Sequence, residues 1–161
     1  MAADFKIACL FEHQSLIPII EKHFKKEWHA YYGPEGPGEA RADIDSFCNT
    51  TILPVGLIAL RNDRITGIVS LREKTESQHD LGPWVTSFYV VPERRGQGVG
   101  TRLVHAVECL AQKLGYKKIY ARSATAVVFF EKLKWVPFDT LTHDAEQMTI
   151  FLKDLPANPS E

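Results

Sequence analysis

The chain has 161 residues, of which 45% are apolar and 24% are charged, and its formal net charge is −1. This composition is typical of a globular domain and gives no electrostatic basis for nucleic acid or an anionic membrane as the main partner. The three cysteines are far apart and form no Cys-x-x-Cys motif, so we expect no disulfide framework and a cytoplasmic location. We expect one domain over residues 1–161, with a core over about 5–153 and a frayed tail over 154–161.

The N-terminal third of the chain predicts one strand and two helices. The strand covers residues 5–10, and Ser15 is placed to cap the helix that follows. Apolar residues then recur every four positions and give that helix one apolar face, which carries Leu16, Ile20, Phe24 and Trp28. Glycine and proline alternate over residues 33–38, so the helix ends near Tyr32 and a loop follows. A second short helix is predicted over residues 39–50.

The remainder of the chain predicts six strands and two further helices. The expected strands cover residues 55–60, 65–71, 84–91, 118–121, 135–142 and 147–152. The expected helices cover residues 99–114 and 126–134. Hairpins combined with two strand-helix-strand crossovers indicate an α/β (mixed α+β) fold, with a mixed sheet covered by helices.

The most informative segment lies between the strand over 84–91 and the helix over 99–114. Glycine occupies every second position at Gly96, Gly98 and Gly100, directly after Arg94 and Arg95. Glycine lets the backbone turn sharply and approach a ligand closely. The first N–H groups of a helix lack intrahelical acceptors, and the helix dipole favours an anion there. The pattern therefore predicts a phosphate or pyrophosphate site, and the alternative is a tight turn without a ligand.

Two other phosphate-binding motifs fit this segment poorly. A P-loop requires Gly-Lys-Ser/Thr after four spacer residues, and that sequence is absent. The dinucleotide fingerprint GxGxxG lacks its third glycine, because Thr101 stands at that position. The next expected strand also ends at Arg122 instead of an acidic residue, which would suit only a 2′-phosphate variant.

Two motifs resemble those of the GNAT superfamily of acyl-CoA-dependent N-acetyltransferases. The first is Arg95-Gly96-Gln97-Gly98-Val99-Gly100, which is similar to the family's Arg/Gln-x-x-Gly-x-Gly/Ala signature. The second is the stretch over 126–135, which is similar to the family's Ala-x-x-Phe-Tyr-Glu-Lys-x-Gly-Phe helix end. The resemblance covers about residues 5–153. It implies a central mixed, mostly antiparallel sheet of about seven strands, flanked by about four helices.

The resemblance also implies acetyl-CoA as cosubstrate, with no metal. The pyrophosphate would lie on the loop amides of Arg95, Gly96, Gln97, Gly98, Val99, Gly100 and Thr101. The pantetheine arm would pair with the backbone of a splayed central strand at Phe88, Tyr89 and Val90. Phe130 stands where the family often has a tyrosine that protonates the departing thiolate, and phenylalanine has no proton to give. Ser123 stands where the family often has an asparagine.

The implied reaction is direct attack of a primary amine, from a small molecule or a peptide, on the acetyl thioester. An alkylamine is protonated at neutral pH, so some group must accept its proton. The central strand carries no carboxylate near its middle, and the candidate bases are Glu73, His79 and Asp80. Tyr89 and Ser123 are candidate acids.

Aromatic residues flank the predicted acceptor site. The candidates for substrate contact are Trp28, Tyr31, Tyr32 and Trp84. Because Phe130 replaces the usual tyrosine, a non-catalytic acyl-CoA-binding or sensing module is the alternative function. We expect a monomer or homodimer without nucleic-acid or membrane partners.

Overall fold

The computed structural model describes residues 4–75, 80–143 and 145–157, and these form one sheet with helices on both faces. The strands within these ranges are β1 (Phe5–Cys9), β2 (Val55–Arg61), β3 (Arg64–Arg72), β4 (Trp84–Val90), β5 (Lys118–Ser123), β6 (Val136–His143) and β7 (Glu146–Asp154). The α-helices are α1 (Ile17–Glu27), α2 (His29–Tyr32), α3 (Ala40–Ser46), α4 (Val99–Lys113) and α5 (Val127–Lys132). Two short 3-10 helices, η1 (Leu10–Leu16) and η2 (Pro92–Arg94), precede α1 and α4. Among the described helices, none is both long and apolar enough to cross a membrane.

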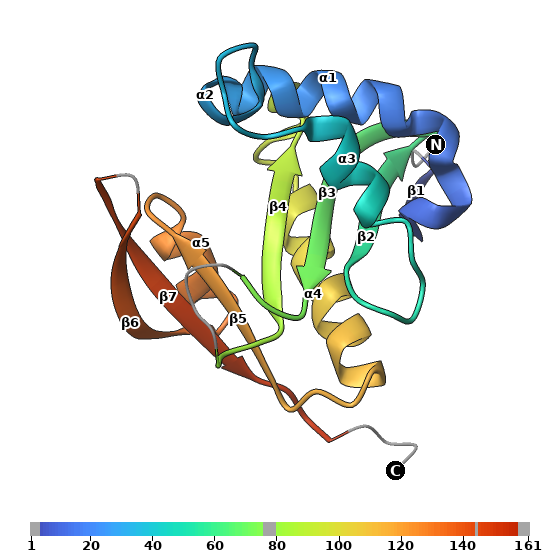
Figure 1. Cartoon of the computed structure of the whole chain (residues 1–161). Coiled ribbons are helices and arrows are strands. Elements are labelled where there is room, and N and C mark those ends of the chain that lie inside the picture. The colour runs from blue at the N-terminus through green and yellow to red at the C-terminus, as the bar shows by residue number, and fades with distance from the viewer. Residues whose placement is uncertain (1–3, 76–79, 144, 158–161) are drawn as a thin grey trace.

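The sheet has the order β1-β2-β3-β4-β5-β7-β6. Neighbouring strands are antiparallel except β4 and β5, which are parallel and joined through α4. A parallel pair needs a crossover connection, and α4 supplies it behind the sheet in Figure 1. The predicted mixed, mostly antiparallel sheet of seven strands is confirmed, with five α-helices in the described residues where about four were expected.

Side chains of β2 alternate between two apolar cores, one on each face of the sheet. Leu57 and Ala59 belong to the core beneath α4, whereas Ile58 and Leu60 belong to the core beneath α1 and α3. Successive side chains of a strand point to opposite faces, so a strand covered on both sides reads as a continuous apolar run. The run over residues 55–60 is buried throughout, as its composition predicts.

The central strand β4 bulges and then separates from its parallel neighbour. Its register against β3 shifts between Ile68 and Ser70, and Ser87 takes a positive φ of 51° at this point. In the described chain β4 pairs with β5 at one position, Trp84 opposite Tyr120. Beyond that pair the two strands diverge, as Figure 1 shows, and leave one edge of β4 without a strand partner. A bulge inserts an unpaired residue and bends the strand, which accounts for the divergence.

Three local predictions for the N-terminal half differ from the structure. The strand predicted over 5–10 ends at Cys9, and Leu10 starts η1. Ser15 does not cap α1, because η1 runs into that helix and Leu16 holds the cap position without a side-chain hydrogen bond. The helix predicted over 39–50 is shorter, because the Asn49 side chain donates hydrogen bonds to the carbonyls of Ser46 and Pro54 and holds the following turn.

The C-terminal segment is held against the protein up to the last described residue. The Leu155 N–H donates to the Lys117 carbonyl, 2.9 Å away. The Gln112 side-chain amide donates to the carbonyls of Pro156 and Ala157 at 2.9 and 3.2 Å. β7 thus continues to Asp154 and these bonds follow it, where the sequence predicts a frayed tail from residue 154.

Candidate active site

A first cavity, the loop cavity, lies at the open edge of β4 beside the glycine-rich loop. Its volume is about 520 Å³. It is lined by Glu27, Phe88, Tyr89, Val90, Arg94, Arg95, Gly96, Gly98, Val99, Gly100, Thr101, Thr125, Ala126 and Phe129. Segments far apart in sequence thus meet here: the end of α1, β4, the loop with the start of α4, and the start of α5.

The three glycines of the loop perform two different structural tasks. Gly96 and Gly98 have φ angles of +76° and +87°, which favour glycine, and a Cβ at either would project into open space. At Gly100 a Cβ would lie 3.1 Å from the Phe88 ring and 3.5 Å from the Phe129 ring. The first two glycines therefore shape the turn, and the third lets the first turn of α4 approach these rings closely.

The loop amides are free of protein acceptors. Arg102 donates its N–H to the Gly98 carbonyl at 3.1 Å, the first backbone bond that reaches back across the start of α4. Within the described residues, no backbone or side-chain acceptor is recorded for the amides of residues 96–101. A helix start with unsatisfied N–H groups attracts anions. The loop therefore presents free amides at the start of α4, where the sequence predicts a phosphate site.

The two arginines before the loop differ in what they contact. Arg95 donates from Nε to the Val90 carbonyl at 2.9 Å and from Nη2 to Glu27 at 3.3 Å, and its guanidinium lies 5.7 Å from the centre of the Tyr89 ring. Arg94 lines the loop cavity, and its side chain has no hydrogen-bond or ion-pair partner among the described residues. The side chain available to an anion is therefore that of Arg94, whereas the charge of Arg95 is offset by Glu27.

Successive residues of β4 direct their backbone N–H and C=O groups to alternate edges of the strand. Tyr89 and Val90, both predicted to contact the coenzyme, therefore differ in which edge they face. The Val91 N–H donates to the Thr66 carbonyl at 2.9 Å, and hydrogen-bonded pairs alternate along an antiparallel ladder. Tyr89, two residues earlier and opposite Ile68, consequently bonds to β3. Val90 directs both its N–H and its C=O to the open edge, where Arg95 occupies the carbonyl. The backbone of Tyr89 is thus directed towards β3, although the residue lines the loop cavity, and its contact with the pantetheine arm stays a prediction.

A second cavity, the acceptor cavity, opens between the diverging strands β4 and β5. Its volume is about 590 Å³. One wall is formed by Trp28, Tyr31 and Tyr32, which follow α1, and the opposite wall carries Ser123, Phe130, Glu146 and Met148. Arg122 also lines it. The two cavities share Glu27, Phe88, Thr125 and Ala126, so they meet at the bulged part of β4.

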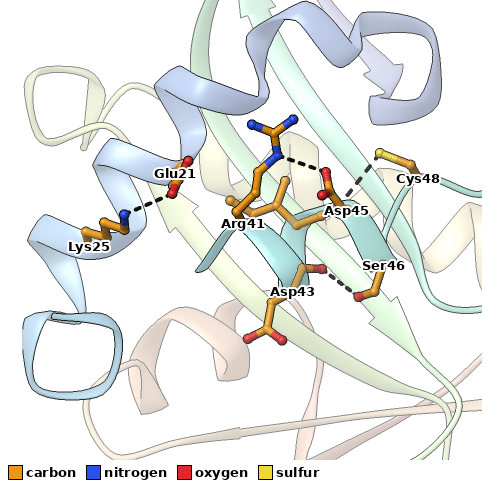
Figure 2. A network of polar contacts seen from close by, with 8 residues as sticks. Glu21, Lys25, Arg41, Asp43, Asp45, Ser46 and Cys48 are labelled. Carbon is orange, nitrogen blue, oxygen red and sulfur yellow. Dashed lines mark hydrogen bonds and ion pairs between the residues drawn. The ribbon is translucent and has the colours of Figure 1, made fainter. Parts of the chain in front are cut away.

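Packing and hydrogen bonding hold the aromatic wall. Trp28 lies edge-on to the buried Phe24, with ring centroids 4.9 Å apart. The Tyr32 hydroxyl donates to Asp43 of α3 at 2.7 Å. Burial, together with this carboxylate, raises the pKa of Tyr32 well above its usual value of 10.0, so the phenol keeps its proton. Figure 2 shows that α3 is itself braced by polar contacts, with Arg41 paired to Asp45 and Ser46 donating to the Asp43 carbonyl.

The structure defines the surroundings of Ser123, a candidate acid, and of Phe130, which stands where the family often has a tyrosine. The Ser123 oxygen accepts the N–H groups of Thr125 and Ala126, at 3.2 and 2.9 Å, so its own proton remains available for donation into the acceptor cavity. Phe130 is 3% exposed and stacks on Phe151, with ring centroids 5.3 Å apart. Its role is to close the floor between the strands, and it also lines the acceptor cavity.

Several predicted site residues lie away from both cavities. Glu73 is exposed beyond the far end of β3, where its charge acts on Tyr116, and Asp80 is exposed in the loop before β4. Trp84 is completely buried at the start of β4, where its indole donates to the Leu81 carbonyl, so its proposed contact with substrate is wrong. Gln97 turns its side chain away from the loop cavity and donates to the Glu93 carbonyl. His79 lies outside the described residues.

Other lining residues are not apparent from the sequence motifs. Glu27 borders both cavities, but it belongs to a helix 68 residues before its partner Arg95. Phe129 contacts Phe88 with ring centroids 5.7 Å apart, and the resemblance drew attention only to its neighbour Phe130. Glu27 directly precedes Trp28 in the sequence. This adjacency to a predicted substrate contact is the one signal that could have identified it.

A comparison with protein-family models matches residues 55–137, just over half of the chain, to the acetyltransferase (GNAT) domain. The matched stretch contains the bulged strand β4, the glycine-rich loop, α4, β5 and α5. This chain belongs to the GNAT acetyltransferase family. As a member of this family, the chain is an acyltransferase. A comparison with curated proteins finds no match.

Solved structures share the GNAT fold over nearly the whole chain. An aminoglycoside 6′-N-acetyltransferase complexed with coenzyme A has a TM-score of 0.77 and 15% identity, covering 96% of this chain and 99% of the other. The aminoglycoside 6′-N-acetyltransferase from Enterococcus faecium has a TM-score of 0.75 and 16% identity over the same shares. The structure of yncA from Salmonella typhimurium with its cofactor acetyl-CoA has a TM-score of 0.71 and 14% identity, covering 99% and 97%. Identities this low establish the fold alone.

Beneath the GNAT loop, a histidine contact links β4 to α1. The Tyr89 hydroxyl lies 3.0 Å from His23 Nδ1. Burial is the main cause that lowers the pKa of His23 below 6.5. Lys26 lowers it further, and Glu93 opposes the shift. Burial raises the pKa of Tyr89, so the contact joins a neutral imidazole and a protonated phenol.

We predict that the His23→Gln variant loses part of the acid sensitivity of folding. With a lowered pKa in the folded protein, the unfolded chain binds the proton more tightly, so the free energy of unfolding falls as the pH drops below about 6.5. Urea unfolding between pH 7.5 and 5 should show a shallower decline in the variant. His105→Gln, on the exposed face of α4, is the control, and equal declines in wild type and His23→Gln would refute the prediction.

Proposed function

We propose that this GNAT protein transfers the acetyl group of acetyl-CoA to a primary amine of a small molecule or peptide, by direct attack in a ternary complex. The observation that carries the proposal is the meeting of two cavities at the bulge of β4. One cavity has an anion-binding loop at its far side, and the other has an aromatic wall. Two substrates that enter from opposite sides would meet beside Phe88.

The loop cavity fits the coenzyme by its shape and its donors. The free amides of residues 96–101 and the unpaired Arg94 supply hydrogen bonds and charge for a pyrophosphate. Gly96 and Gly98 leave the approach open. The bound cosubstrate supplies an acetyl thioester, whose carbonyl carbon is the site of attack. The apolar lining by Val99 and Phe129 suits the arm that connects the two ends.

The Val90 N–H can stabilise negative charge on the thioester oxygen. It faces the open edge of β4 in the loop cavity, two residues beyond Phe88, where the cavities meet. A fixed N–H directed at an oxygen that gains charge in the transition state typically contributes about 10²–10³-fold in rate. The rigidity of the sheet holds this donor in place before the substrates arrive, so little reorganisation is needed.

Glu27 is the carboxylate best placed to receive the proton of the amine. An amine with a pKa near 10.4 must lose a proton to expose its lone pair. Glu27 lines both cavities and lies 3.3 Å from Arg95. The carboxylate attracts the ammonium group of the acceptor and then accepts its proton directly or through water.

Ser123 lines the acceptor cavity and would face the departing sulfur of a bound thioester. The amine nitrogen forms the new bond to the carbonyl carbon, the carbon–sulfur bond breaks, and the electron pair leaves with sulfur. The two N–H groups that the Ser123 oxygen accepts orient its hydroxyl proton into the cavity. Ser123 thereby donates a hydrogen bond to the developing thiolate, which takes up a proton from solvent as the product leaves.

The acceptor cavity selects for an amine attached to a body that stacks on aromatic rings. Trp28, Tyr31 and Tyr32 offer ring faces and edges, which attract cations and apolar surfaces alike. The structural neighbours include aminoglycoside N-acetyltransferases, so aminoglycosides belong in a substrate panel beside alkylamines and peptides with free N-termini or lysines.

The proposed function is tested by calorimetry with acetyl-CoA and by release of free CoA thiol with that amine panel. We expect binding at micromolar concentration and thiol release above the hydrolysis background with at least one amine. Binding without release for every amine would favour the non-catalytic acyl-CoA sensor. Absence of binding at millimolar concentration would reject both functions.

We predict that Gly98→Ala weakens acetyl-CoA binding by at least about tenfold. A Cβ at this φ strains the backbone by about 1–2 kcal/mol and turns the loop amides away from the ligand. Gly115→Ala is a matched control, because Gly115 ends α4 with a φ of +92° and an equally open Cβ direction. Both variants should lose similar stability in urea unfolding, and only Gly98→Ala should lose binding in calorimetry. Equal binding by the two variants would contradict the cradle.

We predict that Glu27→Gln lowers kcat by about 10²-fold while acetyl-CoA affinity changes less than about threefold. The amide keeps the size of the side chain but cannot take a proton. Glu21→Gln, on the same helix and paired with Lys25, is the control. Release of CoA thiol at saturating amine should fall in Glu27→Gln and stay at the wild-type rate in Glu21→Gln. An unchanged kcat in Glu27→Gln would show that water or another group accepts the proton.

A further inference from the structure

Three arginines converge on a small hollow that shares Arg94 with the loop cavity. The hollow has a volume of about 210 Å³, and its polar lining consists of Arg61, Thr66, Arg94, Gln97 and Arg102. The remaining lining residues are Phe5 and Val99. The arginines come from the end of β2, from η2 and from the first turns of α4. We name this site the arginine hollow.

The charges of the arginine hollow are not balanced by the protein. No carboxylate is among its lining residues. In the described part of the chain, none of the three arginines forms an ion pair. Arg61 reaches the Gln97 oxygen at 3.5 Å, and Arg102 lies 4.0 Å from the centre of the Phe5 ring. Neither contact offsets a charge, so the three guanidinium groups repel one another until an anion enters.

The neighbouring contacts orient these side chains. Arg61 lies opposite Phe5 in the β1–β2 register, and the Phe5 ring lies beneath Arg102. Gln97 is fixed by its bond to the Glu93 carbonyl and presents its oxygen to Arg61. Guanidinium groups held by an aromatic face and an amide lose little further freedom on binding. Their planar forks suit the oxygens of a phosphate.

We propose that the arginine hollow is a binding site for a phosphate monoester, separate from the pyrophosphate cradle. Arg94 and Val99 line both the hollow and the loop cavity, so the two anions would lie side by side. Coenzyme A carries such a monoester at the 3′ position of its ribose, and a separate phosphorylated molecule carries the same group. The coenzyme as source rests on the proposed function, whereas the site itself does not.

Calorimetry with coenzyme A and with 3′-dephospho-coenzyme A shows whether the monoester bound in the hollow is that of the coenzyme. If the hollow binds the ribose monoester, wild type should prefer coenzyme A by about tenfold, the effect of one charge-assisted contact. Arg61→Gln and Arg102→Gln should reduce this preference towards one, with affinity for the dephospho form unchanged. Arg64→Gln is the matched control, because Arg64 lies opposite Arg61 in the β2–β3 hairpin but does not line the hollow.

A second arm uses inorganic phosphate alone, with binding followed by the ³¹P line width. If a separate phosphorylated molecule is the ligand, phosphate should bind wild type and Arg64→Gln about tenfold more tightly than Arg61→Gln or Arg102→Gln, with no preference between the two coenzymes. Absence of both effects would overturn the proposal. Failure of the proposed function would appear differently, as loss of binding by both coenzymes while the phosphate arm still reports on the hollow.

Discussion

The divergence of β4 from β5 is the constraint on which the site depends. In the interior of a seven-stranded sheet, every backbone group would ordinarily bond to a neighbouring strand. Here the strands pair at Trp84 and Tyr120 and then separate past the bulge at Ser87. The buried cluster of Trp84, Tyr120 and Ile150 fixes the closed end. Backbone donors thus become available to a ligand within a rigid frame, which a loop could not provide with equal precision.

The unpaired edge leaves backbone groups of β4 without a strand partner, and the Arg95 side chain bonds to one of them. Its Nε bonds to the Val90 carbonyl, and its Nη2 pairs with Glu27 across 68 residues of sequence. One side chain therefore joins the loop, the central strand and the end of α1. A change in the loop on ligand binding would be felt at Glu27, on the border of the acceptor cavity. The two substrate sites are connected by this contact as well as by their shared walls.

Local patterns predicted the parts of the site that local sequence determines. The spacing of Gly96, Gly98 and Gly100 before an apolar helix specifies a turn with free amides, and such a turn forms there. The pattern could not distinguish Arg94 from Arg95, because neighbouring side chains diverge according to contacts made elsewhere. Glu73 and Trp84 were misplaced because their distance from the bulge depends on strand register. The sequence could not identify Glu27 as a site residue, because only the tertiary fold brings α1 to β4.

The replacement of the usual tyrosine by Phe130 alters the balance of proton transfers without preventing the reaction. A thiol has a pKa near 8.5, so a thiolate is a tolerable leaving group at neutral pH and can be protonated after departure. An alkylamine, with a pKa near 10.4, cannot attack before it loses a proton. The reaction therefore depends more on a group that accepts the proton of the amine than on one that protonates the thiolate. Phe130 stacks on Phe151 and meets Trp135 edge-on, so the floor of the cavity is stabilised by packing. Proton transfer is left to polar groups such as Glu27 at the junction and Ser123 in the acceptor cavity.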